Sequence, residues 1–490
     1  MPMPRALPVR ALPLLLALAA AWAPGLSAQS TPAKNGHAAR EAPVRYDRDL
    51  LPPEFHRARR DTVLAALPRG SVAVVLGGAE AGGALDDVKE YIQDPYLYYL
   101  TGSLEPGSAL LLAPDGVDLQ GGTVREILFV PPRDHDTEIW LGRRFGPERA
   151  QQELGVEAAL PNTRFGDLVE PILAQPGRKV FLLPFPEAVP PKTALAEQIG
   201  AVAEAAQVNG GAFDDVTLGV VLDGLREVKT PEEIALLQRA VDITGAALRE
   251  AIGSMEPGWA EYDIEAVLEY TFRRMGSERP GFPSIVGSAE NSVLLHYDTN
   301  RRVTRAGDLV VMDVGASYRG YTADVTRTVP VDGRFTKEQR AIYEIVLEAQ
   351  EAAIGAVRAG ASFGAPGEAA ALVMARGLAK LGLIRGPEDW AGLRRFFPHG
   401  TSHYLGLQVH DVGSYRALRA GAVVTIEPGI YIPPSDDVDP RWWNLGVRIE
   451  DDLLVTDGKP VVLSAGIPKD PDELEALMAA ARAAAQAGGR

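Results

Sequence analysis

The chain has 490 residues, a formal net charge of −16 at pH 7 and no cysteine. This length gives room for two or three domains with substantial cores. The negative charge repels phosphate backbones and argues against a nucleic-acid partner, and the lack of cysteine excludes a disulfide framework.

Residues 1–28 have the features of a secretory signal peptide. Arg5 and Arg10 precede an apolar run over 11–21, and the tripeptide Leu-Ser-Ala before Gln29 resembles a small-residue cleavage site. The run is too short for a retained membrane span, although an uncleaved anchor is the alternative. We therefore expect an exported protein, periplasmic or secreted, that begins near Gln29 and has no stable membrane span after cleavage.

The rest of the chain divides into a lead-in and two expected domains. Residues 29–45 lack hydrophobic periodicity and predict a flexible segment. Residues 46–222 alternate β-type runs, such as SVAVVLGG and REILFVPP, with helical stretches, which predicts an α/β domain. Thr230 and Glu233, with a proline between them, form a capping box at the start of a new helix, so we place the second domain over 223–490.

The second domain shows a similar pattern twice, at low sequence similarity. Predicted helices precede a pair of acid-bearing strands over 232–329 and again over 338–456. An alanine-rich stretch, ELEALMAAARAAAQAGG, predicts a closing helix.

The stretch LVVMDVGASYRGYTADVTRTV places two aspartates on a predicted hairpin. If LVVMDVGA and YTADVTRT pair around a turn at Tyr318-Arg319, Asp313 and Asp324 stand directly opposite, about 5 Å apart on one sheet face. Facing carboxylates repel each other, and a cation between them removes the repulsion. An edge hairpin with solvated acids is the alternative.

Four histidines and two glutamates stand in segments on either side of this hairpin. His296 lies in SAENSVLLHYDTN, and PHGTSHYLGLQVHDVG contains three more, His399, His403 and His410. Glu427 and Glu450 each end a run rich in β-branched residues. Four carboxylates and one imidazole are the ligand set expected of two divalent cations that share a site, and the residues in question are Asp313, Asp324, His403, Glu427 and Glu450.

Together these segments resemble the Xaa-Pro aminopeptidases (aminopeptidase P), which are proline-specific metallopeptidases of the pita-bread fold. The matching segments are IVGSAENSVLLHY, GDLVVMDVGASYRGYTADVTRTVPV, HGTSHYLGLQVHDVG, TIEPGIYI and GVRIEDD, with QDPYLYYLTGSLEPGSALLL and LFVPPRDHDTEIWLGRRFG upstream. The resemblance implies an α/β N-terminal domain and an α+β pita-bread catalytic domain, with pseudo-twofold halves on a curved antiparallel sheet. It also implies proline-containing peptides as substrates and a homo-oligomeric enzyme.

By the same resemblance, two divalent metal ions bind the five residues; we expect manganese, with cobalt, zinc or iron as alternatives. Asp313 and Asp324 ligate one ion, Asp324 and Glu450 bridge the pair, and His403 and Glu427 complete the second site. Glu427 is also expected to accept the proton of the attacking water. Such a pair of ions acidifies water and polarises a carbonyl oxygen.

The remaining site residues are expected to contact the substrate. His296 and His410 stabilise the tetrahedral intermediate, and His399 belongs to the pocket for the proline ring. Arg448 lies two residues before Glu450 and so shares its strand face; it steadies an acid or meets substrate, with a surface ion pair as the alternative. Tyr98 occupies the place of a tryptophan in some bacterial relatives and is assigned to substrate binding.

Prolidase, which cuts Xaa-Pro dipeptides with the same metal site, is the principal alternative function. The N-terminal match and the expected export favour the aminopeptidase. A methionine aminopeptidase leaves the long N-terminal domain unexplained, and the creatinase-like enzymes of this fold lack metals. A non-catalytic peptide-binding module of this fold typically loses ligands, whereas all five are present here.

Overall fold

The computed structural model describes residues 50–78, 91–119, 121–185, 189–190, 192–210 and 213–488. The expected signal peptide and lead-in lie outside the described residues. Among the helices within these ranges, none combines the length and the apolar character needed to cross a membrane.

The first part of the described chain is built on a mixed six-stranded sheet in the order β4-β3-β2-β1-β5-β6. Strands β1, β2 and β3 pair antiparallel, whereas β4, β5 and β6 join the sheet in parallel. The strands are β1 (Ser71–Leu76), β2 (Ala109–Leu119), β3 (Gly122–Val130), β4 (Ala158–Pro161), β5 (Lys179–Phe181) and β6 (Phe213–Asp214). The helices are α1 (Pro53–Ala66), α2 (Pro95–Thr101), α3 (His135–Leu141), α4 (Gly146–Leu154), the 3-10 turn η2 (Asn162–Arg164), α5 (Phe165–Leu173), α6 (Ala194–Val208) and α7 (Thr217–Glu227).

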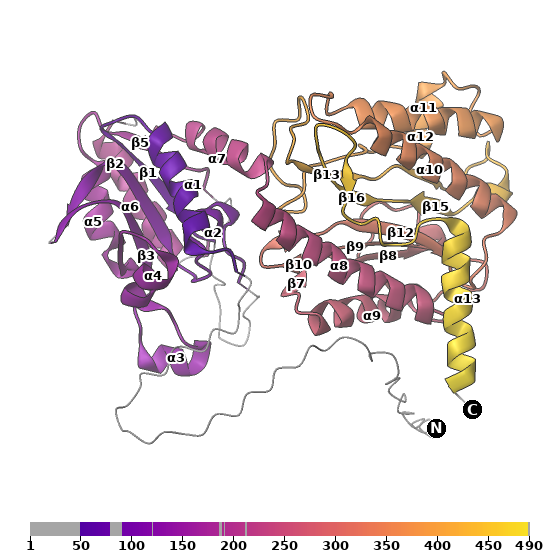
Figure 1. Cartoon of the computed structure of the whole chain (residues 1–490), viewed down its shortest axis with the longest axis horizontal. Helices are drawn as coiled ribbons and strands as arrows, with labels where there is room; N and C mark the ends of the chain where they lie inside the picture. The colour runs from indigo at the N-terminus through magenta and orange to yellow at the C-terminus, as the bar shows by residue number, and fades with distance from the viewer. Residues whose placement is uncertain are drawn as a thin grey trace. The chain divides into compact units, whose positions relative to one another are not determined.

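Alternating side chains of this sheet enter two separate hydrophobic cores. Ala73 and Val75 pack into one core with residues of α1, α2, α4 and α7, while Val72 and Val74 pack into the other with α5 and α6. Strands that are buried on both faces belong to a sheet covered by helices on both sides. This part is therefore an α/β layered structure, as predicted (Figure 1).

The second part repeats one arrangement, two long helices followed by antiparallel strands. The helices are α8 (Pro231–Ser254) and α9 (Glu261–Arg274) in the first half, α10 (Lys337–Ala356), α11 (Ala365–Lys380) and α12 (Trp390–Phe396) in the second, and a closing α13 (Pro471–Gly488). At the start of α8, the predicted capping box is present, with Glu233 N donating to Thr230 Oγ1 and Thr230 N donating to Glu233 Oε2.

The strands of both halves pair antiparallel in every ladder among the described residues. In the first half they are β7 (Arg279–Pro280), β8 (Ile285–Ser288), the 3-10 turn η3 (Ala289–Asn291), β9 (Leu309–Val314), β10 (Ala316–Tyr318), β11 (Tyr321–Thr322) and β12 (Val325–Pro330). In the second they are β13 (Val423–Ile426), β14 (Gly429–Ile432), the 3-10 turn η4 (Pro440–Trp442), β15 (Leu445–Arg448), β16 (Asp451–Leu454) and β17 (Val461–Val462). Helices α8 and α9 pack on the first set and α10 on the second (Figure 1).

The hairpin that carries Asp313 differs from the predicted register by two residues. β9 and β12 pair Asp313 with Thr326, and the chain turns at Arg319-Gly320. Both turn residues have positive φ, 52° and 81°, the type I′ geometry that favours glycine. The predicted turn at Tyr318-Arg319, with Asp313 directly opposite Asp324, is therefore wrong. A shift of two residues preserves the alternation of faces, so the two aspartates still share one face, in diagonal positions.

Candidate metal centre

Five residues that are far apart in the sequence lie together on these strands. Asp313 is in β9, and His403 lies in the segment that precedes β13. Asp324, Glu427 and Glu450 each occupy a break between two strands, β11 and β12, β13 and β14, and β15 and β16. Such interruptions of a sheet often redirect a side chain beside an active site.

Hydrogen bonds fix Glu450 and His403 to neighbouring strands. Glu450 N donates to Thr326 O over 3.1 Å, and Thr326 Oγ1 donates to Glu450 Oε2 over 2.7 Å. His403 N donates to Thr425 Oγ1 over 3.2 Å, and Thr425 N donates to His403 O over 3.0 Å. Strand β12 therefore holds Glu450, and strand β13 holds His403.

The side-chain atoms of the cluster are close enough to share a cation. Asp324, His403 and Glu450 each offer one ligand atom, and these atoms lie within 4.8 Å of one another. His403 Nε2 is 3.4 Å from Asp324 Oδ2 and 3.8 Å from Glu427 Oε1. His403 Nδ1 lies 3.0 Å from Tyr404 O, so this nitrogen carries the donated hydrogen and Nε2 keeps its lone pair toward the acids.

Three acids of the cluster, Asp324, Glu427 and Glu450, resist ionisation when no cation is near. Burial, and then the charge of Glu450, raise the pKa of Asp324 and of Glu427 well above their ordinary values. Burial, and then the charge of Asp313, raise the pKa of Glu450 to about 8. Burial lowers the pKa of His403 to about 4, so its imidazole is neutral at pH 7 and able to bind a metal.

Three of the four carboxylates also have a buried oxygen that lacks a hydrogen-bond donor among the described residues. These oxygens are Asp313 Oδ1, Asp324 Oδ1 and Glu450 Oε1. A buried carboxylate oxygen without a partner is costly, and a shared positive charge would stabilise these three. The donor set fits divalent cations that prefer oxygen ligands, with His403 as the nitrogen ligand.

Arg448 is buried at the edge of the cluster and contacts an acid rather than the surface. Its Nη2 donates to Asp313 Oδ2 over 2.6 Å, which leaves Asp313 Oδ1 for the centre. Its Nη1 donates to Tyr431 Oη over 2.8 Å, and Tyr431 Oη lies 2.8 Å from His399 Nε2. Sequence reasoning missed Tyr431, because a tyrosine in a buried strand has the pattern of a core residue.

The two histidines expected to stabilise the intermediate lie beside the cluster and are exposed. The rings of His410 and His403 have centroids 4.5 Å apart and meet edge to face. Burial, and then the positive charge of Arg448, lower the pKa of His399 to about 4, and the charge of nearby His296 adds to this effect. His296, His399 and His410 are thus near the candidate centre, and their roles remain predictions.

Tyr98 lies against the turn of the aspartate hairpin. Its ring is buried, and its hydroxyl donates to Arg319 O over 3.0 Å. A Cβ atom at Gly320 would lie 3.2 Å from the Tyr98 ring, so the glycine also permits this close packing. These contacts support the turn, and the substrate-binding role of Tyr98 remains a prediction.

Asp452 is an additional acid that sequence reasoning missed. Its Oδ2 accepts a hydrogen bond of 3.1 Å from Asp324 N, and burial raises its pKa well above the ordinary value. Its place near the centre could have been predicted from the sequence, because a residue two places after Glu450 shares the face of Glu450 in an extended chain. Asp452 therefore holds the backbone of a proposed ligand.

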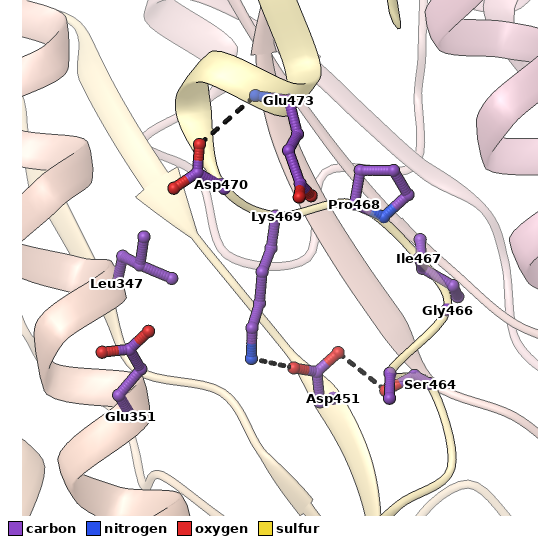
Figure 2. Close-up of a pocket in the computed structure, with 11 residues that line it drawn as sticks. Leu347, Glu351, Asp451, Ser464, Gly466, Ile467, Pro468, Lys469, Asp470 and Glu473 are labelled. Carbon is purple, nitrogen blue, oxygen red and sulfur yellow. Dashed lines mark hydrogen bonds and ion pairs between the residues drawn. The ribbon is translucent and has the colours of Figure 1, made fainter.

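Behind the cluster, a buried ion-pair network fixes the strand that follows Glu450. Arg327 donates to Glu450 O over 2.6 Å and to Asp451 Oδ1 over 2.8 Å. Figure 2 shows Lys469 and Ser464 converging on the same carboxylate, at 2.6 and 2.7 Å. The adjacent cavity of about 270 Å³ is lined by Leu347 and Glu351 of α10, by Asp451 and by residues of the C-terminal segment, and by none of the five candidate ligands.

Comparisons with known proteins extend over both parts of the chain. Residues 235–457 match the model of metallopeptidase family M24, and residues 56–181 match that of the aminopeptidase P N-terminal domain. The chain is 37% identical over 439 residues to Xaa-Pro aminopeptidase of Escherichia coli, with 88% of this chain and 98% of that protein covered.

Solved structures agree with this result. A variant of Escherichia coli aminopeptidase P in complex with substrate superposes with a TM-score of 0.80 at 35% identity, covering 88% of this chain and 99% of that one. Aminopeptidase PepP of Pseudomonas aeruginosa gives a TM-score of 0.80 at 34% identity, covering 89% of this chain and 99% of that one.

These matches confirm the predicted fold class, an α/β N-terminal domain followed by an α+β pita-bread domain with a curved antiparallel sheet. The five candidate ligands all lie within the region that matches the metal-dependent peptidases. The chain therefore belongs to metallopeptidase family M24, among the aminopeptidase P proteins.

Proposed function

We propose that the chain is a dinuclear metal-dependent aminopeptidase that releases the N-terminal residue from peptides with proline in the second position. One observation carries the proposal: Asp324, Glu450 and a neutral His403 offer ligand atoms within 4.8 Å of one another, in a chain that covers 98% of an Xaa-Pro aminopeptidase. A retained N-terminal domain together with a retained ligand set supports an enzyme over a peptide-binding module.

The proposed metal ligands divide into two overlapping sets. Asp313 and Asp324 would hold one ion and His403 and Glu427 the other, with Asp324 and Glu450 shared between the two sets. When bound, the ions supply an acidified water and a Lewis acid for the scissile carbonyl. Manganese suits a site with four carboxylates and one imidazole.

The chain's own side chains then perform the remaining tasks. Glu427 takes the proton of the attacking water, and His296 and His410 donate hydrogen bonds to the oxygen of the tetrahedral intermediate. His399 contributes to the proline pocket. Because an Xaa-Pro bond has no N–H to donate, the ring shape of proline must be recognised in its place. Arg448 orients Asp313 through their ion pair and is also proposed to meet the substrate.

Substrate length and sequence test this proposal against prolidase. The purified protein is assayed on an Xaa-Pro-Xaa tripeptide, on the matching Xaa-Pro dipeptide and on Xaa-Ala-Xaa. The aminopeptidase cleaves the tripeptide in preference to the dipeptide and leaves the alanine peptide largely intact. Preference for the dipeptide identifies a prolidase, and the absence of any cleavage with metals bound identifies a binding module.

Export, assembly and domain limits complete the proposal. Residues 1–28 are proposed to be removed as the protein is exported to the periplasm or secreted. The boundary between the two domains is proposed at residues 222 and 223, and the mature enzyme is proposed to be a homo-oligomer. N-terminal sequencing of the native protein tests the cleavage, gel filtration tests the assembly, and limited proteolysis tests the domain boundary.

A further inference from the structure

The end of α7 and the short connection to α8 carry three charged residues that are almost fully buried. Arg226, Glu227 and Lys229 are 1%, 3% and 4% exposed, a degree of burial that charged side chains reach only when they are paired. Their partners lie in the segment that runs from His403 to Gly421, about two hundred residues further along the chain.

The Asp411 carboxylate pairs with both buried cationic side chains, Arg226 and Lys229. Its Oδ1 accepts a hydrogen bond from Arg226 Nη2, and its Oδ2 accepts one of 3.1 Å from Lys229 Nζ. The side chains of all three residues are 1% exposed. Arg226 Nη2 also donates to Gln408 Oε1 over 3.0 Å. Since Asp411 directly follows His410, these bonds fix the backbone that carries the His410 imidazole.

A backbone hydrogen bond closes the loop that carries His410, residues 404–411, which we call the His410 loop. Asp411 N donates to Tyr404 O over 2.9 Å, which brings the two ends of the loop together and sets the rings of His403 and His410 at 4.5 Å. A methyl group at Gly406 would overlap the Asp411 carboxylate and lie 3.0 Å from Lys229 Cε. The glycine therefore makes room for the ion pairs.

Glu227 fixes the other side of this loop. It accepts hydrogen bonds from Tyr404 Oη over 3.1 Å, from Ser414 Oγ over 3.0 Å and from Arg419 Nη1 over 3.3 Å. On the N-terminal side, the ring of Tyr96 in α2 lies 4.6 Å from the Arg226 guanidinium. The segment 226–229 thus connects α2 with the His410 loop.

We propose that Asp411, with Arg226 and Lys229, is a positioning cluster that holds the His410 imidazole against His403 at the candidate metal centre. The inference rests on the proposed function, in which His410 acts on the reaction intermediate. Two cationic side chains on one buried carboxylate add little to the free energy of unfolding. They do restrict the Asp411 carboxylate, and His410 beside it, to one geometry. A displacement of about 1 Å at a reacting group costs roughly a hundredfold in rate.

Asp411→Asn tests the cluster by removing its negative charge at constant shape. We expect full metal content and a kcat on an Xaa-Pro-Xaa peptide lower by about ten- to a hundredfold, with KM within about twofold. Gly406→Ala is the second variant, because it displaces the carboxylate while keeping every charge, and it should lower kcat in the same way. Glu126→Gln is the matched control, since it removes the charge of another buried carboxylate that pairs with an arginine, Arg60, and that lies outside the His410 loop.

A double-mutant cycle separates positioning from general damage. If Asp411 acts through His410, Asp411→Asn lowers kcat in the wild-type background and causes no further loss in the His410→Ala background. An equal loss in both backgrounds overturns the proposal, as does unchanged turnover in both Asp411→Asn and Gly406→Ala.

A direct readout of the imidazole keeps the inference distinct from the proposed function. The chain has seven histidines, so the ¹⁵N ring resonances of the zinc-loaded protein can be assigned by substitution. The His410 resonances should move in Asp411→Asn and stay in place in Glu126→Gln. Unmoved resonances overturn the positioning cluster whatever the kinetics. If they move while His410→Ala keeps its full turnover, the cluster stands and the proposed role of His410 fails.

Discussion

Removal of the metals should make the folded protein less stable as the pH rises. In the metal-free protein, burial raises the pKa of Glu450 to about 8, whereas a carboxyl group in the unfolded chain ionises near 4.5. Between these two values the folded state binds a proton that the unfolded state has lost. The contribution of this group to stability is therefore fully present below the unfolded pKa and disappears as the pH passes through the folded pKa.

The expected magnitude follows from the same two values. For Glu450 alone, the free energy of unfolding falls by about 2 kcal/mol between pH 6 and pH 8. Asp324 and Glu427, whose pKa values are also raised, add to the loss in the same direction. Bound cations keep these carboxylates deprotonated, so the loaded protein should lack this slope.

Urea unfolding of the chelated and the metal-loaded protein at several pH values measures the effect. Reloading the chelated protein at pH 6.5 should also release at least about one proton per chain, which a weakly buffered indicator dye detects. The reasoning is refuted if the metal-free protein is as stable at pH 8 as at pH 6, or if loading at pH 6.5 releases no proton.

Three further predictions concern the ligands, the histidines and the N-terminus. Asp324→Asn and Glu450→Gln should each abolish hydrolysis and lower metal content while circular dichroism stays unchanged; two bound metals with near-normal rates would refute the assignment. His410→Ala should keep its metals and lose roughly two to three orders of magnitude in turnover. His403→Ala should lose metal first and activity as a consequence. A metal titration that gives the reverse result would exchange the roles of the two histidines. N-terminal sequencing of the native protein should begin near Gln29, and an intact initiator methionine would contradict the proposed signal peptide.

The structure brings Asp324, His403 and Glu450 together, as expected from the sequence, while the role of each residue stays a prediction. The alternation of side chains along strands predicted that Asp313 and Asp324 share a face. This prediction holds although the predicted register is wrong, because the register differs by an even number of residues. The register itself depends on φ at Arg319 and Gly320, and the glycine after Arg319 was the available signal for the type I′ turn.

Long-range partners explain what sequence reasoning missed. Asp452 could have been predicted, because it lies two residues after Glu450 and so shares its face. Tyr431 and Lys229 could not, since each acts through residues distant in the chain: Tyr431 bonds Arg448 and Lys229 bonds Asp411. No local pattern in hydropathy or spacing distinguishes these residues from an ordinary core tyrosine or a surface lysine.

The central claim is that Asp313, Asp324, His403, Glu427 and Glu450 form one dinuclear site that hydrolyses Xaa-Pro bonds. The most direct test is a titration of the chelated protein with Mn²⁺, with bound metal and hydrolysis of an Xaa-Pro-Xaa peptide measured on the same samples. The account predicts no activity without metal and full activity at two bound equivalents per chain. Full activity in the chelated protein, or two bound equivalents without cleavage, would contradict it.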